Sequence, residues 1–202
     1  MIDHIIAELK AGNQRFLNNQ TQLSSSSSLS KLKEFAKNGQ VPKAVVLCCS
    51  DSRAPVEIIF DQDIGDLFVI RVAGNIVAPS LVGSIEFAVS EFGIKLVLVM
   101  GHTQCGAITA TLNHIHSGAL ADTANLHSIV SRIKPHIYPI AKITGLSHEE
   151  QICRSVEANV IASVAQIESS SRMLEEKVQA NEVRIKGAIL DISTGEVNFL
   201  DV

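Results

Sequence analysis

Three long apolar runs constrain the fold of this 202-residue chain more than any other feature. They occupy residues 44–49, 67–72 and 96–100, and a fourth run at residues 184–190 and a short fifth at residues 197–200 follow later in the chain. A strand that is buried on both faces reads as a nearly continuous apolar run, whereas a strand with one wet face alternates. The runs therefore predict strands of a parallel sheet with helices on both of its faces.

Helical signals lie between and after these runs. Residues 79–93 begin at a proline and end at a glycine, as helices often do, and residues 104–116 and 122–138 are two more expected helices. Ser147 and Glu150 have the spacing of a capping box, which opens a long helix that we expect to reach Leu174. The alternation predicts an α/β fold with a mostly parallel central sheet flanked by helices.

The N-terminal part of the chain, about residues 1–35, is expected to form a helical arm. Apolar residues recur at helical spacing between Ile2 and Leu9, and a second short helix is expected at residues 32–35. The Ser-rich stretch between the two helices is typical of a connecting loop. Because no change in composition marks a second unit, we expect residues 1–202 to form a single domain.

Charge and composition narrow the classes of function. The formal net charge is −4 and only 4% of residues are aromatic, with no tryptophan, so neither a basic nucleic-acid surface nor an aromatic membrane belt is expected. No apolar stretch has the length of a membrane span, and four cysteines are too few for a disulfide scaffold. We therefore expect no nucleic acid or membrane partner and a reducing, cytoplasmic location, with Cys48 and Cys153 as buried thiols.

Two of the apolar runs end in residues that can bind a metal ion. The first run leads into Cys49, and the third leads into His102 and Cys105. The carboxyl ends of parallel strands meet at one edge of a sheet, which is where ligands bind. Two thiolates and one imidazole form the donor set of a zinc site with an open fourth position, as in catalytic zinc centres. The sequence therefore predicts one Zn²⁺ per chain, held by these three side chains.

Asp51 and Arg53 closely follow the first of these cysteines. A carboxylate beside zinc can bind the ion or accept a hydrogen bond from water on it, and an arginine can hold that carboxylate ionised. Two other interpretations stay open at this point. Cys105 with His102 as its base could make a metal-free thiol hydrolase, which leaves Cys49 without a role. The chain could also be a non-catalytic zinc-binding module.

The segments at residues 49–53 and 101–106 closely resemble the paired motifs of the β-class carbonic anhydrases. The resemblance continues through residues 66–75 and 83–88 and is looser over the last strands. It implies the β-carbonic anhydrase fold and a zinc-dependent lyase. The implied reaction is the reversible hydration of carbon dioxide to bicarbonate and a proton, by attack of zinc-bound hydroxide.

Carried over residue by residue, the resemblance assigns zinc ligation to Cys49, His102 and Cys105, and catalysis to Asp51 and Arg53. The family has two types of active site. In the plant-like type, which we expect here, the aspartate stays on the arginine and water takes the fourth zinc position. In the other type, the aspartate can close onto the zinc as a fourth ligand, and this closed state stays possible for Asp51.

The resemblance also implies a substrate pocket formed by Gln40, Phe68, Ala73, Phe87 and the backbone N–H of Gly106. Plant members carry Tyr in place of Phe87 and a larger Val in place of Ala73, so the pocket here lacks a phenol and is expected to be roomier. The family implies a homo-oligomer, a dimer or a tetramer of dimers. Its N-terminal helices wrap a partner subunit, and its active sites lie near the subunit interface.

Two questions stay open. A hydrolase of carbon disulfide or carbonyl sulfide on the same scaffold is the nearest alternative function, because both molecules are linear like carbon dioxide. Hydration also releases a proton that needs a carrier, and His114, His116, His127 and buffer are all candidates.

Overall fold

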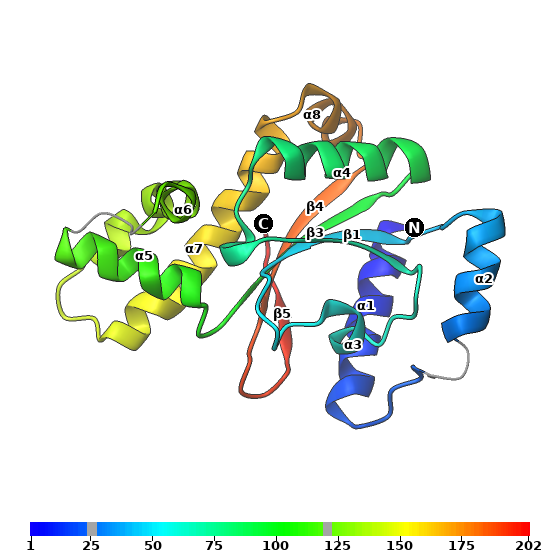
Figure 1. The fold of residues 1–202 in the computed structure, drawn as a ribbon, viewed down its shortest axis with the longest axis horizontal. Helices are drawn as coiled ribbons and strands as arrows, with labels where there is room; N and C mark the ends of the chain where they lie inside the picture. The colour runs from blue at the N-terminus through cyan, green and yellow to red at the C-terminus, as the bar shows by residue number, and fades with distance from the viewer. Residues whose placement is uncertain (24–27, 119–122) are drawn as a thin grey trace.

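A five-stranded sheet carries the fold of the computed structural model, which describes residues 1–23, 28–118 and 123–202 (Figure 1). The strands lie in the order β2-β1-β3-β4-β5; the first four run parallel, and β5 is antiparallel to β4. The predicted α/β fold with a mostly parallel sheet is therefore confirmed. The strand bounds are β1 Ala44–Cys48, β2 Leu67–Arg71, β3 Leu96–His102, β4 Arg184–Leu190 and β5 Val197–Phe199.

Helices connect and cover the strands, mostly where the sequence predicts them. The predicted long helix after Ser147 is wrong in one respect, because it ends at Ser169 and a separate helix follows. Ser171 starts this second helix, since its side chain accepts a hydrogen bond from the backbone N–H of Leu174. The helix bounds are α1 Ile2–Leu17, α2 Ser28–Asn38, α3 Val56–Ile59, α4 Pro79–Phe92, α5 Gly106–Ser117, α6 Ala124–Ala141, α7 His148–Ser169 and α8 Arg172–Gln179, with a 3₁₀ turn at Ala73–Asn75.

Both faces of the sheet are buried, which explains the continuous apolar runs. Along β1, Val45 and Leu47 point to the face that α4 and α7 cover, whereas Val46 and Cys48 point to the face that α1 and α3 cover. Successive side chains of a strand alternate between faces, so every position of this strand needs an apolar residue. The whole of β1 is accordingly buried.

The helix α1 packs closely on its own chain. A Cβ on Gly12 would lie 1.8 Å from the carbonyl oxygen of Phe60, so only glycine allows this approach. The neighbouring Asn13 is buried, and its amide nitrogen donates to the carbonyl oxygens of Ile59 and Gly195. By contrast, the side chains of α2 are mostly exposed. Residues 24–27 of the predicted Ser-rich loop lie outside the described residues.

The strand order creates one place where a ligand site is expected. From β1 the chain crosses to β2 on one side and later returns to β3 on the other side. The carboxyl ends of β1 and β3 therefore flank a topological switch point, which is where open α/β sheets bind ligands. A third cluster of buried residues joins α5, α6 and α7 beside this point. None of the described helices combines the length and the hydropathy that a membrane span requires.

Candidate metal centre

Cys49, His102 and Cys105 lie together at the switch point. Cys48 pairs with Met100 in the parallel ladder of β1 and β3, which brings Cys49 level with the end of β3, and Cys105 caps the start of α5. The three potential ligand atoms all lie within 4.8 Å of one another. Cys49 is 6% exposed, and His102 and Cys105 are each 1% exposed. The predicted triad is thus assembled in a buried position.

Histidine 102 is arranged as a metal ligand would be. Its Nδ1 lies 2.8 Å from the carbonyl oxygen of Thr103, so Nδ1 carries the proton and donates it to that oxygen. Its Nε2 is buried and has no hydrogen-bond partner. A buried polar atom without a partner is costly, and a metal ion would remove that cost.

The two thiols complete a donor set that fits zinc. The hydrogen bond from Cys105 lowers the pKa of Cys49 well below its usual range, with help from His102 and from the backbone N–H of Gly74. The same contact with Cys49, together with burial, raises the pKa of Cys105, because a second thiolate beside the first is unfavourable. Two thiolates with one neutral imidazole are typical of zinc, and a cation between the two sulfurs would remove that repulsion. The side chains therefore fit one Zn²⁺.

The carboxylate of Asp51 lies beside the triad and is held by Arg53. Arg53 donates from Nη2 to Oδ2 at 2.8 Å, from Nε to Oδ1 at 3.0 Å and from its backbone N–H to Oδ1 at 2.9 Å. These contacts, the side-chain bond first, hold the pKa of Asp51 well below its usual range. Its Oδ2 lies 3.9 Å from Nε2 of His102. The carboxylate is thus ionised, close to the metal position and turned toward the arginine.

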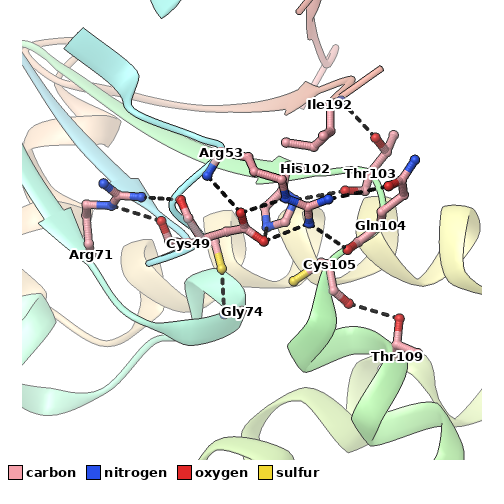
Figure 2. Close-up of polar contacts among 11 residues, drawn as sticks. Cys49, Arg53, Arg71, Gly74, His102, Thr103, Gln104, Cys105, Thr109 and Ile192 are labelled. Carbon is pink, nitrogen blue, oxygen red and sulfur yellow. Dashed lines mark hydrogen bonds and ion pairs between the residues drawn. The ribbon is translucent and has the colours of Figure 1, made fainter. Parts of the chain in front are cut away.

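Arg71 fixes the loop that carries Cys49 and Asp51. Its Nε donates to the carbonyl oxygen of Cys49 at 3.0 Å, and its Nη2 donates to the carbonyl oxygen of Asp51 at 2.6 Å. Figure 2 shows this side chain on the Cys49 side of the centre. Sequence reasoning missed this role, although Arg71 ends β2 beside β1 and interrupts an otherwise apolar run.

Backbone contacts from the turn at Gly74 support Cys49. The N–H of Gly74 lies 3.4 Å from its sulfur, and Gly74 has a φ of +71°, which favours glycine. The carbonyl oxygen of Gly74 accepts a bond from the buried amide of Asn159 on α7 at 2.9 Å. Helix α7 therefore anchors the turn that contacts the thiol.

The predicted substrate-pocket residues fall into two groups. Ala73 precedes Gly74 in the turn, and Gly106 follows Cys105 at the start of α5, so both border the triad. Phe68 pairs with Val45, four residues before Cys49 along β1, which places it on the order of 13 Å away along the sheet.

The other two pocket residues also lie away from the centre in this chain. Phe87 is 53% exposed and packs with Phe68 and Phe92 in an aromatic cluster. Gln40 is exposed in the connection before β1, and no hydrogen bond joins it to the triad in the described structure. One chain therefore does not bring Gln40, Phe68 and Phe87 to the metal centre.

The remaining cysteines and the candidate proton carriers lie outside the triad. Cys48 is buried, and burial raises its pKa to about 12, but Cys153 is exposed on α7, so the expectation of a buried thiol there is wrong. Of the proposed proton carriers, His114 and His116 lie in the last turn of α5 and His127 in α6.

Comparisons with known proteins agree on one family. A family model described as "Carbonic anhydrase" matches residues 44–197. Carbonic anhydrase 2 of Mycobacterium tuberculosis is 34% identical over 193 residues, which cover 96% of this chain and 90% of that protein. The carbonic anhydrase of Mycolicibacterium smegmatis is 35% identical over 192 residues, covering 95% of this chain and 89% of that protein.

Solved structures give the same result. The β-carbonic anhydrase CafA of Aspergillus fumigatus superposes with a TM-score of 0.72 at 28% identity, covering 87% of this chain and 90% of that one. A tetrameric β-carbonic anhydrase of Sordaria macrospora superposes with a TM-score of 0.71 at 25% identity, covering 88% of this chain and 94% of that one.

Proposed function

The chain belongs to the β-class carbonic anhydrases, and from this membership we propose that Asp51 and Arg53 are its catalytic pair, at a zinc ion held by Cys49, His102 and Cys105. Its activity is the reversible hydration of carbon dioxide to bicarbonate and a proton, which makes it a lyase. One observation carries the assignment of roles. An ionised carboxylate lies beside a buried triad whose imidazole presents an unpartnered Nε2.

The mechanism divides between the metal and the chain. Zinc, when bound, supplies a Lewis acid that makes hydroxide available near neutral pH. Asp51 accepts a hydrogen bond from the attacking oxygen. This orients a lone pair of that oxygen toward the carbon atom of carbon dioxide. Arg53 keeps that carboxylate ionised and aimed through its paired N–H groups. The free N–H of Gly106 at the start of α5 donates to a substrate oxygen, and Ala73 forms part of the apolar wall.

A second copy of the chain completes the substrate pocket in this proposal. Gln40, Phe68 and Phe87 do not reach the triad of their own chain, so we propose that they line the pocket of a partner subunit. Two observations support this. β2 is an edge strand, and its neighbourhood exposes an aromatic side chain, Phe87. Leu29, Leu32 and Val41, close to Gln40 in sequence, are exposed as well.

The arm takes part in this interface through its second helix. Because α1 is fixed on its own sheet and the side chains of α2 are mostly exposed, α2 is the part of the arm that presents a surface to a partner. Both a dimer and a tetramer of dimers fit this proposal, and the Sordaria relative is tetrameric. Analytical ultracentrifugation distinguishes the two assemblies, and a monomer that retains full activity would contradict the shared pocket.

Three finer statements complete the proposal. Residues 1–202 act as a single domain, because all of the strands join one sheet. The centre is of the plant-like type with Asp51 on Arg53, although this carboxylate is near enough to become a fourth ligand if that pair opens. Free thiolate ligands suit a reducing compartment, so a cytoplasmic location is proposed.

Substitution of Asp51 tests the assigned roles. We expect Asp51→Asn to keep one zinc per chain but to lose carbon dioxide hydration by about a hundredfold or more, since the neutral amide has one acceptor oxygen where the carboxylate has two. Asp3→Asn is the matched control, because that carboxylate is exposed on α1 and pairs with Arg184 away from the centre. Full activity in Asp51→Asn would overturn the assignment.

Assays of the wild-type protein separate the remaining functions. Zinc without carbon dioxide hydration would indicate a non-catalytic zinc module. Hydrolysis of carbon disulfide or carbonyl sulfide in preference to carbon dioxide hydration would indicate the alternative hydrolase. Hydrolytic activity in the metal-free protein would indicate the thiol hydrolase.

A further inference from the structure

A cavity of about 460 Å³ lies beside the loop between His102 and Cys105. Thr103 and Gln104, the two residues between these ligands, form part of its wall. In Figure 2 they lie on the side of the centre opposite Arg71. The cavity has room for several waters, since one water takes roughly 30 Å³. Its titratable wall residues are His148, Glu149 and Cys153 of α7 and Asp191 of the β4–β5 turn.

Polar contacts lead from the catalytic carboxylate to this wall. Arg53, which binds Asp51, also donates from Nη1 to the side-chain oxygen of Gln104 at 3.4 Å and from Nη2 to its carbonyl oxygen at 3.3 Å. Gln104 therefore touches the catalytic pair and borders the cavity. The catalytic pair itself does not line the cavity, so Gln104 is the contact between the two.

Among the histidines, only His148 lines this cavity. All seven lie in the described residues, and His102 is a metal ligand. His4 is on α1, His114 and His116 end α5, and His127 and His136 are on α6. His148 is also exposed, at the first position of α7, so buffer molecules can reach it. This residue was not among the candidates from the sequence.

Chemistry favours the imidazole over the other groups in the cavity. Histidine is the side chain whose ordinary titration lies closest to neutral pH, whereas carboxylates and thiols titrate well below and above it. Hydrogen bonds, first from the Ser193 side chain, lower the pKa of Asp191 further, so this group stays ionised. Glu149 and Cys153 are the other two groups that face the same space.

We propose that His148 is the proton-transfer residue of this enzyme and that water in this cavity connects it to Gln104, which contacts Arg53 of the catalytic pair. The proton that hydration releases passes along the waters, each of which takes up one proton as it gives one, to the unprotonated ring nitrogen of His148, which becomes imidazolium. The imidazolium then gives that proton to a buffer base and is neutral again, so no other reactant is consumed. The inference rests on the proposed function, because hydration of carbon dioxide is the source of the proton.

Comparison of His148→Ala with wild type in dilute buffer tests the proposal. We expect kcat for hydration to fall by about tenfold or more, while kcat/KM stays within about twofold of the wild-type value. The reason is that the proton-release step contributes to kcat but not to kcat/KM. Oxygen-18 exchange at chemical equilibrium should show an unchanged rate of carbon dioxide–bicarbonate interconversion and a slower release of labelled water. Added imidazole should restore kcat. His127→Ala, an exposed histidine outside the cavity, should behave as wild type.

Each outcome separates this inference from the proposed function. If wild type hydrates carbon dioxide and His148→Ala keeps its kcat in dilute buffer, proton transfer through His148 is refuted and the function stands. If interconversion and water release fall together without rescue by imidazole, His148 is structural and the proposal is refuted. If wild type shows no hydration in any buffer, the proposed function itself fails.

Discussion

The contact of Arg71 with the metal loop allows a quantitative prediction about zinc affinity. Arg71→Met keeps much of the side-chain length but removes both bonds to the carbonyl oxygens of Cys49 and Asp51. Bonds from a charged donor contribute about 1.5–3 kcal/mol each, and the exposure of Arg71 reduces this, so we take about 2 kcal/mol for the pair. If the loop loses that much preorganisation, zinc binding weakens by about thirtyfold. Outer contacts of metal ligands have effects of this size.

Competition with a chromophoric chelator measures this affinity directly. Arg172→Met is the matched control, because that arginine is exposed on α8 and pairs with Glu176, away from the metal loop. Arg71→Lys should fall between wild type and Arg71→Met, since an ammonium cannot bind both carbonyls in the same fork. If Arg71→Met binds zinc within about twofold of wild type, loop positioning by this arginine is refuted.

Two further predictions concern stability, measured by urea unfolding. Gly12→Ala should destabilise the protein by about 1–3 kcal/mol, because the new Cβ meets the backbone of Phe60. Its control, Gly83→Ala, has open space around the new Cβ and should stabilise the protein by about 0.5–1 kcal/mol. Equal changes in stability in the two variants would contradict the packing of α1. Burial lowers the pKa of His136 in the folded protein, so the unfolded state binds the proton more tightly. The stability of the wild type should therefore fall as pH drops below about 6.5. His136→Gln should lose less stability over the same pH range. An identical pH dependence in wild type and variant would show that His136 is not the cause.

The strands and the triad could be predicted because burial leaves a direct trace in the sequence. A strand covered on both faces must be apolar throughout, and Cys49 and His102 follow two such strands. Their meeting also requires β1 and β3 to be neighbours, and the order of the strands in the chain does not fix this adjacency. The structure supplies that adjacency through the pairing of Cys48 with Met100.

Other features depend on contacts that no local pattern records. Arg71 acts on the metal loop only because β2 lies beside β1, and His148 reaches the cavity only because α7 starts near the loop after β3. The exposure of Cys153 could have been foreseen, since Ile152 and Val156 occupy the core-facing positions of the same helix. The separate start of α8 was harder to predict, because apolar residues continue past its cap at Ser171.

Titration of metal-free protein with zinc, followed by the rate of carbon dioxide hydration, tests the central claim most directly. The triad provides one site, so the rate should rise from the uncatalysed level and saturate at one zinc per chain. Hydration by the metal-free chain, or no hydration after one equivalent of zinc has bound, would contradict the account.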